Sequence, residues 1–171
     1  MPDIIVRTGL GQDSHRFEDS FSGKALKLAG VVFDDAPALD GNSDADVVLH
    51  ALCNALTGVH GVVVLGARTD EMCKEGITDS RKYVQEALDH LGSLKLSHVS
   101  VSLECSRPKI APQIGAMRQN LAEMLTLDFR DVAITAHTGE GLTAFGKGEG
   151  ILATVIVTAQ EPHEPAHEEE A

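Results

Sequence analysis

The chain has 171 residues, a net charge of −12 and 43% hydrophobic residues, with 4% aromatics and no Trp. This composition excludes disorder for most of the chain and predicts an aliphatic core. The acidic charge disfavours nucleic acid and anionic membrane surfaces as partners. No apolar run approaches the roughly 20 residues of a membrane helix, and Met1-Pro2-Asp3 lacks the basic region of a signal peptide.

Three cysteines, an odd number without zinc-finger spacing, indicate reduced thiols and a cytoplasmic protein: Cys53, Cys73 and Cys105. We expect one domain over residues 1–160. Residues 161–171 carry five Glu, two Pro and no large hydrophobic side chain, which predicts a disordered acidic tail.

The first segments place candidate metal ligands on regular elements. Alternation over residues 4–16 predicts a strand that delivers Asp13 and His15 at its end. Strand side chains alternate faces, so these two side chains point the same way. Residues 25–32 predict a second, shorter strand, and an Asp/Pro/Gly-rich turn follows over residues 34–41.

A helix is predicted to begin at Ser43, with Asp46 at its third position completing a capping box. His50 would lie two turns into this helix. Asp46 is interpreted as a capping carboxylate and not as a metal ligand. Residues 58–76 hold four Gly around an apolar run, 62–65, and indicate either a strand-like edge or a mobile loop.

The remaining segments alternate between helix and strand. Thr78 or Asp79 would cap a helix that stops at Gly92, and Pro112 would open another with an apolar stripe. Strands are predicted over residues 98–105, 131–138 and 151–159. The last strand is apolar on both faces, which requires a cover on each face, and one cover could be another subunit.

Asp13, His15 and His50 together form the ligand set of a catalytic zinc, with one carboxylate, two imidazoles and a fourth position open for substrate or water. A structural site would normally close its shell, often with cysteine. An Asp-x-His pair alone is more often a hydrogen-bonded turn, and the prediction depends on the position of His50.

The assembled motifs resemble the 2-C-methyl-D-erythritol 2,4-cyclodiphosphate synthase family of the non-mevalonate isoprenoid pathway. The resemblance spans residues 4–159. The matching pieces are Gly11-Gln12-Asp13-Ser14-His15, Ser43-Asp44-Ala45-Asp46-Val47-Val48-Leu49-His50-Ala51-Leu52, Asp79-Ser80-Arg81, Arg107-Pro108-Lys109-Ile110 and Gly146-Lys147-Gly148-Glu149-Gly150.

The resemblance implies an α+β fold with a four-stranded mixed sheet and helices on one face. It implies a homotrimer with the sheets packed around its axis and active sites between neighbouring subunits. It also implies the reaction. The 2-phosphate of 4-diphosphocytidyl-2-C-methyl-D-erythritol 2-phosphate attacks the β-phosphorus, which expels CMP and closes a cyclic diphosphate.

Site roles also follow from the resemblance. Asp13, His15 and His50 would hold zinc, and Glu140 would hold a second divalent cation, Mg²⁺ or Mn²⁺, because oxygen ligands suit hard ions. Thr138 and Asn42 would act in catalysis. Residues 105–111 would form the cytidine pocket. The full set of implied substrate-binding residues is Ser14, Ser43, Asp70, Cys105, Ser106, Arg107, Pro108, Lys109, Ile110, Ala111, His137, Gly139 and Lys147.

This chain departs from the family pattern at several positions. Asn42 stands where the family usually has His, and Lys147 where it usually has Arg, which keeps the charge and loses the bidentate fork. The Gly-Asp-Ile-Gly segment that reads the erythritol hydroxyls is missing near residues 61–64. His137-Thr138-Gly139-Glu140 replaces the frequent Thr-Thr-Thr-Glu. Two alternatives therefore stay open: a metal-dependent phosphoesterase or lyase acting on another nucleotide diphosphate, and a non-catalytic trimer that binds nucleotide or isoprenoid phosphates.

Overall fold

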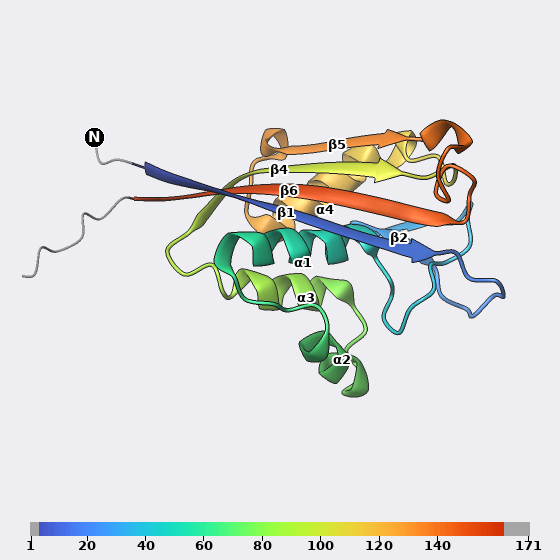
Figure 1. The fold of residues 1–171 in the computed structure, drawn as a ribbon, viewed down its shortest axis with the longest axis horizontal. Helices are drawn as coiled ribbons and strands as arrows, with labels where there is room; N and C mark the ends of the chain where they lie inside the picture. Colours follow the sequence, from blue (N-terminus) through green and yellow to red (C-terminus); the bar gives the residue numbers. More distant parts are fainter. Residues whose placement is uncertain (1–3, 163–171) are drawn as a thin grey trace, which may run out of the picture.

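A computed structural model describes residues 4–162 (Figure 1). Four long strands form one mixed sheet in the order β1-β6-β4-β5, in which β1 and β4 each pair antiparallel with β6, and β4 pairs parallel with β5. The strands of this sheet are β1 (Ile4–Arg16), β4 (Lys95–Glu104), β5 (Val132–His137) and β6 (Gly150–Pro162). The helices are α1 (Val47–His60), α2 (Ala67–Lys74), α3 (Ser80–Leu88) and α4 (Ile114–Leu125).

All helices that pack on the sheet cover one of its faces. Alternate residues of the strands are buried on that face, such as Val99, Val101 and Leu103 of β4 and Val155 and Val157 of β6. Helix α1 is apolar on nearly all sides because it lies between the sheet and α3 (Figure 1). The predicted α+β fold with a mixed four-stranded sheet and helices on one face is confirmed.

Helix α1 packs unusually close to β1, and two glycines allow it. A Cβ on Gly11 would overlap the Ala51 carbonyl oxygen, and a Cβ on Gly9 would overlap the Ala55 carbonyl oxygen. Because neither strand residue carries a side chain, the helix backbone rests directly on the strand. This contact sets the distance between the end of β1 and the first turn of α1, where His50 lies.

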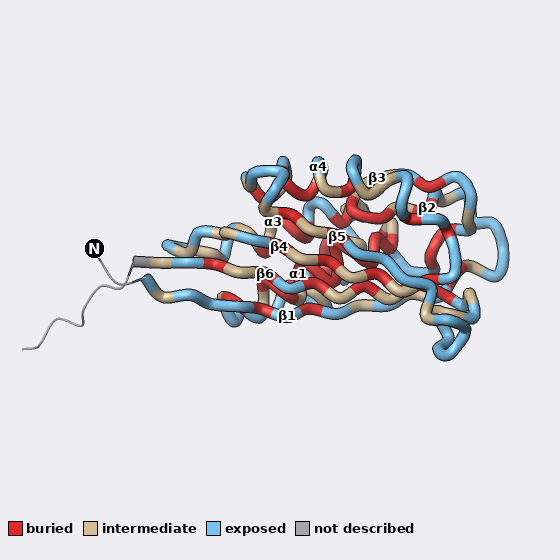
Figure 2. Tube along the Cα trace, turned by 90° about the horizontal axis from the view of Figure 1, so that it is seen from above, coloured by how far each residue is buried: buried red, intermediate tan, exposed pale blue. Residues whose placement is uncertain are grey.

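The opposite face of the sheet is open in the single chain (Figure 2). Large apolar side chains on it are substantially exposed, with 57% of Val6, 64% of Leu10 and 42% of Ile156 accessible to solvent. They alternate with polar residues, and Gln12 donates a hydrogen bond to Thr154 across the strands. Strand β6 is therefore buried on one face only in this structure.

Several local predictions are wrong. Residues 25–32 form part of a hairpin of β2 (Leu26–Leu28) and β3 (Val31–Phe33), because Ala29 and Gly30 have positive φ and turn the chain between them. Helix α1 begins at Val47 and not at Ser43, so Asp46 is its N-cap and His50 lies in its first turn. The Ser43 hydroxyl instead accepts from the Ala45 backbone N–H in the preceding turn.

Residues 58–76 contain a helix, α2, where a strand-like edge or mobile loop was predicted, and α1 continues to His60. Strand β6 runs through Glu161 and Pro162, which were predicted to belong to the tail. Glu161 forms a 2.7 Å ion pair with Arg7 on β1, and the strand pairing continues to this point. The rest of the predicted tail lies outside the described residues.

Across residues 4–162, every helix falls short of the length and apolar content that crossing a bilayer requires.

Candidate metal centre and active site

Asp13, His15 and His50 come together at the end of β1 and the start of α1. The Asp13 Oδ2 atom lies 3.0 Å from His15 Nε2 and 3.1 Å from His50 Nδ1, and the two ring nitrogens are 3.1 Å apart. The edges of this triangle are close to the ~3.4 Å separation of ligand atoms in a tetrahedral zinc site with bonds of about 2.0–2.1 Å. Within residues 4–162 this is the one group of three or more possible metal ligands.

The donor set fits a cation. The Asp40 carbonyl can only accept a hydrogen bond, and it lies 2.8 Å from His15 Nδ1, so this nitrogen carries the proton. The Nε2 lone pair of neutral His15 then faces the centre of the triangle, beside the Asp13 carboxylate. Two imidazoles and one carboxylate are a ligand set that suits catalytic zinc, because three protein ligands leave the fourth tetrahedral position to substrate or water.

The electrostatics of the cluster favour a positive charge between its three groups. Burial pushes the pKa of Asp13 upward, but hydrogen bonds to His15 and His50 outweigh burial and hold the pKa well below its ordinary value. The hydrogen bond to Asp13 raises the pKa of His15 above its usual value. The carboxylate therefore stays ionised across the physiological range and carries a negative charge in the centre of the cluster.

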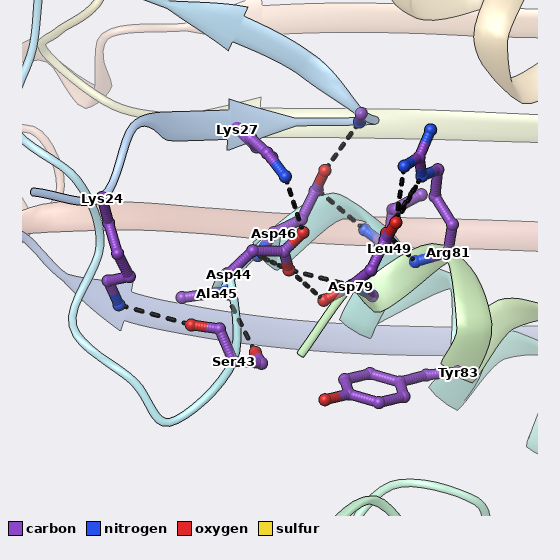
Figure 3. Close-up of polar contacts among 12 residues, drawn as sticks. Lys24, Lys27, Ser43, Asp44, Ala45, Asp46, Leu49, Asp79, Arg81 and Tyr83 are labelled. Carbon is purple, nitrogen blue, oxygen red and sulfur yellow. Dashed lines mark hydrogen bonds and ion pairs between the residues drawn. The ribbon is translucent and has the colours of Figure 1, made fainter. Parts of the chain in front are cut away.

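The turn before α1 is built around Asp46 (Figure 3). Its fully buried carboxylate accepts from the backbone N–H groups of Ala29, Gly30 and Leu49, at 2.9, 2.7 and 3.2 Å. Burial raises the pKa of Asp46, and the three backbone donors act in the opposite direction. Asp46 therefore caps α1 and ties it to the β2–β3 turn, as expected of a capping carboxylate and not of a metal ligand.

The residues that the family resemblance assigns to nucleotide binding lie toward β5, at the edge of the sheet opposite β1. A cavity of about 330 Å³ is lined by a mainly apolar set: Cys105, Ser106, Pro108, Lys109, Ile110, Ala111, Pro112, Ala136, His137 and Thr138. Arg107 does not line it, and its guanidinium instead stacks 4.8 Å from the centre of the Phe17 ring. Burial raises the pKa of the Cys105 thiol to about 11, so this cysteine is a packing group beside the cavity.

Thr138 and Glu140 lie in a tight loop after β5. The Thr138 hydroxyl accepts from the Glu140 backbone N–H at 3.4 Å. Gly139, Glu140 and Gly141 all have positive φ, which is costly at Glu140 because it has a Cβ. The Glu104 carboxylate accepts from the Thr143 hydroxyl and occupies the space that a Cβ of Gly139 would need.

A second cavity, of about 430 Å³, is lined by Asn42, Asp70, Cys73 and Lys74. Tyr83 connects it to the metal cluster, because the Cys73 thiol contacts the Tyr83 hydroxyl and the centre of the Tyr83 ring is 6.1 Å from that of the His50 ring. Helix α2 thus contributes the polar side chains of Asp70 and Lys74 to this cavity, close in sequence to the segment where the Gly-Asp-Ile-Gly pattern is missing.

The two remaining implied residues lie elsewhere. Ser14 lines a small cavity of about 200 Å³ with His15 and Phe145, while the exposed Lys147 side chain is not among its lining residues. Sequence reasoning missed Lys24, whose ammonium donates to the carbonyls of Leu39, Gly41 and Ser43 and holds the loop that carries Asn42. It also missed Ser80, whose hydroxyl contacts His50, and Asp44, which accepts a hydrogen bond from that hydroxyl. The quoted motif Asp79-Ser80-Arg81 was a signal for Ser80.

Fold and site define an α+β protein with a candidate catalytic metal centre at one sheet edge and an apolar cavity at the other. Residues 6–160 match the YgbB family, and the chain belongs to this family. It is 45% identical over 162 residues to 2-C-methyl-D-erythritol 2,4-cyclodiphosphate synthase of Chlamydia muridarum, covering 94% of this chain and 91% of that protein. The protein of the same name from Chlamydia caviae is 44% identical, covering 94% of this chain and 92% of that protein.

Solved structures of similar proteins share the fold of this chain. A 2C-methyl-D-erythritol-2,4-cyclodiphosphate synthase in a CDP-bound form has a TM-score of 0.79 and 28% identity, with 90% of this chain and 99% of that chain covered. The bifunctional IspDF of Campylobacter jejuni has a TM-score of 0.84 and 28% identity. The alignment covers 94% of this chain and 43% of IspDF, so the chain spans less than half of that enzyme.

Proposed function

We propose that this protein is a 2-C-methyl-D-erythritol 2,4-cyclodiphosphate synthase, a phosphorus–oxygen lyase. It converts 4-diphosphocytidyl-2-C-methyl-D-erythritol 2-phosphate to 2-C-methyl-D-erythritol 2,4-cyclodiphosphate and CMP. The proposal rests on the convergence of Asp13, His15 and His50 in a chain of the YgbB family. Its relatives in Chlamydia are named 2-C-methyl-D-erythritol 2,4-cyclodiphosphate synthase.

The chain's own residues meet the needs of the reaction. A dianionic phosphate must approach a second phosphate, so the site has to neutralise charge and hold the two groups in line. Asp13, His15 and His50 would hold zinc, and the bound ion would supply a Lewis acid that polarises the phosphate under attack. Thr138 donates a hydrogen bond to the diphosphate, and Lys147 supplies positive charge. Glu140 would hold Mg²⁺ or Mn²⁺ against the diphosphate.

The nucleotide binds in the cavity lined by Cys105, Ser106 and residues 108–112 and 136–138. Its apolar lining suits a pyrimidine ring, and backbone groups of the 105–111 segment provide directional hydrogen bonds. The remaining implied contacts, Ser14, Ser43, Asn42, Asp70, His137 and Gly139, orient the phosphates and the methylerythritol.

The active form is a homotrimer. Strands β1 and β5 are the two edges of the sheet, so three strand spacings, about 14 Å, separate the strand that carries Asp13 and His15 from the strand that leads to Thr138. A neighbouring subunit would bring its own residues 105–111 and 137–147 against the metal cluster. The exposed apolar side chains Val6, Leu10 and Ile156 support packing of the open sheet face around the trimer axis.

We also expect the protein to work in the cytoplasm as one domain. The three cysteines are unpaired, and burial raises the pKa of the Cys53 thiol to about 12.

The test is direct. Pure protein with zinc and magnesium is incubated with the cytidine-linked substrate, and phosphorus NMR follows CMP and the cyclic diphosphate. Equal release of both products is expected. Release of CMP without cyclic product would favour a phosphoesterase on another nucleotide diphosphate, which the altered residues around Asp70 motivate. Tight CMP binding without turnover would favour a binding protein.

A further inference from the structure

One side of the His50 ring faces away from the metal cluster. Its Nε2 atom lies 2.9 Å from the Ser80 hydroxyl oxygen and 3.4 Å from the Ser43 hydroxyl oxygen. His50 Nδ1 faces Asp13 and His15. A neutral imidazole ligates through a nitrogen lone pair, so His50 can serve the cluster only when its proton is on Nε2 and an acceptor holds it there.

Ser80 can only be that acceptor. Its hydroxyl oxygen lies 2.5 Å from Asp44 Oδ1, and a carboxylate oxygen accepts hydrogen bonds and donates none. The single hydroxyl proton of Ser80 is therefore committed to Asp44, and its lone pair is left to accept from His50 Nε2–H. The direction of the hydrogen bonds is fixed along the chain from His50 to Ser80 to Asp44.

Asp44 is itself held by two other elements (Figure 3). Lys27 of β2 places its ammonium 3.4 Å from Asp44 Oδ2, and the Ser80 backbone N–H, in the first residue of α3, donates to Asp44 Oδ1 at 3.3 Å. Ser80 is completely buried, so water does not compete for its hydroxyl. The carboxylate thus has a defined position between a strand, the turn before α1 and a helix.

Ser43, the other hydroxyl near His50, is arranged differently. It is 0.5 Å farther from Nε2 than Ser80 is, and it already accepts from the Ala45 backbone N–H at 3.0 Å. No carboxylate contact orders its proton among the described hydrogen bonds of residues 4–162. Ser43 therefore offers a matched comparison with Ser80.

We propose that Ser80 and Asp44 are positioning residues for the metal centre, which lock the His50 ring and its Nε2–H tautomer so that Nδ1 presents a lone pair to the ion. This inference rests on the proposed function, because it assumes that the cluster holds zinc. Neither residue touches the ion or the substrate, and both act through His50.

The experiment measures zinc affinity of the full-length protein by competition with a chromophoric chelator. Ser80→Ala is expected to weaken zinc binding about 10–100-fold, the usual effect of removing such a partner. Ser80→Thr keeps the hydroxyl and is expected to restore most of the affinity. Ser43→Ala is expected to weaken binding by less than about 3-fold. Cobalt(II) absorption of each variant reports the ligand geometry, and thermal unfolding of the metal-free proteins reports the fold.

If Ser80→Ala does not fold, Asp44→Asn provides the second variant, since it removes the charge that commits the Ser80 proton, and a loss of about 5–10-fold is expected. Wild-type affinity in folded Ser80→Ala, or equal losses in Ser80→Ala and Ser43→Ala, would overturn the positioning role. A wild-type protein that binds no zinc would instead refute the proposed metal site, so the two failures are distinguishable.

Discussion

The metal cluster and the loop around Thr138 differ in how the fold holds them. Asp13 and His15 lie on a long strand, and His50 lies in a buried helix. Glycines in the strand have no side chain and therefore allow the two elements to pack closely. Thr138 and Glu140 lie in an exposed loop with three consecutive positive-φ residues. The ligands of an ion must meet within tenths of an ångström, so they are carried on a strand and a helix that pack together, whereas a loop can adjust to a phosphate.

Loss of a metal ligand should produce the largest effect. His50→Ala should remove zinc and lower the rate of CMP release at least about 1000-fold, because charge at the phosphate is no longer stabilised. Metal analysis measures the bound zinc, and phosphorus NMR measures the rate of CMP release. His90→Ala, at an exposed histidine in the turn after α3, is the control and should behave as wild type. An active, zinc-free His50→Ala protein would contradict the assigned role.

The second prediction tests whether the core positions the cluster. Gly11→Ala places a methyl group against the Ala51 carbonyl, so α1 must shift away from β1. We expect a loss of about 2–3 kcal/mol in the free energy of unfolding and weaker zinc binding. Gly115→Ala, in α4 with open space around it, should instead raise stability by about 0.5–1 kcal/mol. Denaturant unfolding and zinc competition measure both. An unchanged Gly11→Ala protein would show that the close approach is unnecessary.

The third prediction tests the loop. Gly139→Ala should lower activity about 10-fold and leave zinc affinity unchanged, because its Cβ meets the Glu104 carboxylate as well as straining the backbone. In a Glu104→Ala background the same change should cost less, since only the backbone strain remains. Gly141→Ala, also at positive φ but with open space, supplies the strain alone. Additive effects of Gly139→Ala and Glu104→Ala would exclude a direct contact.

The smallest effect is expected at Lys147. Lys147→Arg restores a planar fork that can hold a phosphate with two hydrogen bonds, and should lower KM for the substrate about 2–5-fold with little change in kcat. Because the side chain is exposed, the gain should shrink as salt is raised. Steady-state kinetics at low and high salt measure it. A gain that is independent of salt would point to packing and not charge.

Local patterns predicted most elements and singled out the three residues that the structure brings together as a candidate metal site. Alternation in β1 placed Asp13 and His15 on one face, and the apolar stripes of α3 and α4 were readable from spacing. Helix α2 was not predicted because its sequence is short and polar. It is stabilised by the Thr69 hydroxyl, which accepts from the Gly66 backbone N–H at its start, and by burial of Met72. The N-cap of α1 was predicted three residues too early, because both Ser43 and Asp46 are good caps. Only Asp46 has three backbone donors from distant segments to satisfy.

The residue types and their spacing along the chain indicated the kind of chemistry: one carboxylate and two imidazoles that can hold a cation. The tertiary structure decided which nitrogen of each imidazole faces the centre of the cluster, because the Asp40 carbonyl and the Ser80 hydroxyl reach the rings from residues 25 and 30 positions away. It also decided that the ligand strand and the Thr138 loop lie at opposite sheet edges. Hydrogen-bond direction and strand order depend on contacts between distant segments, and no local pattern encodes them.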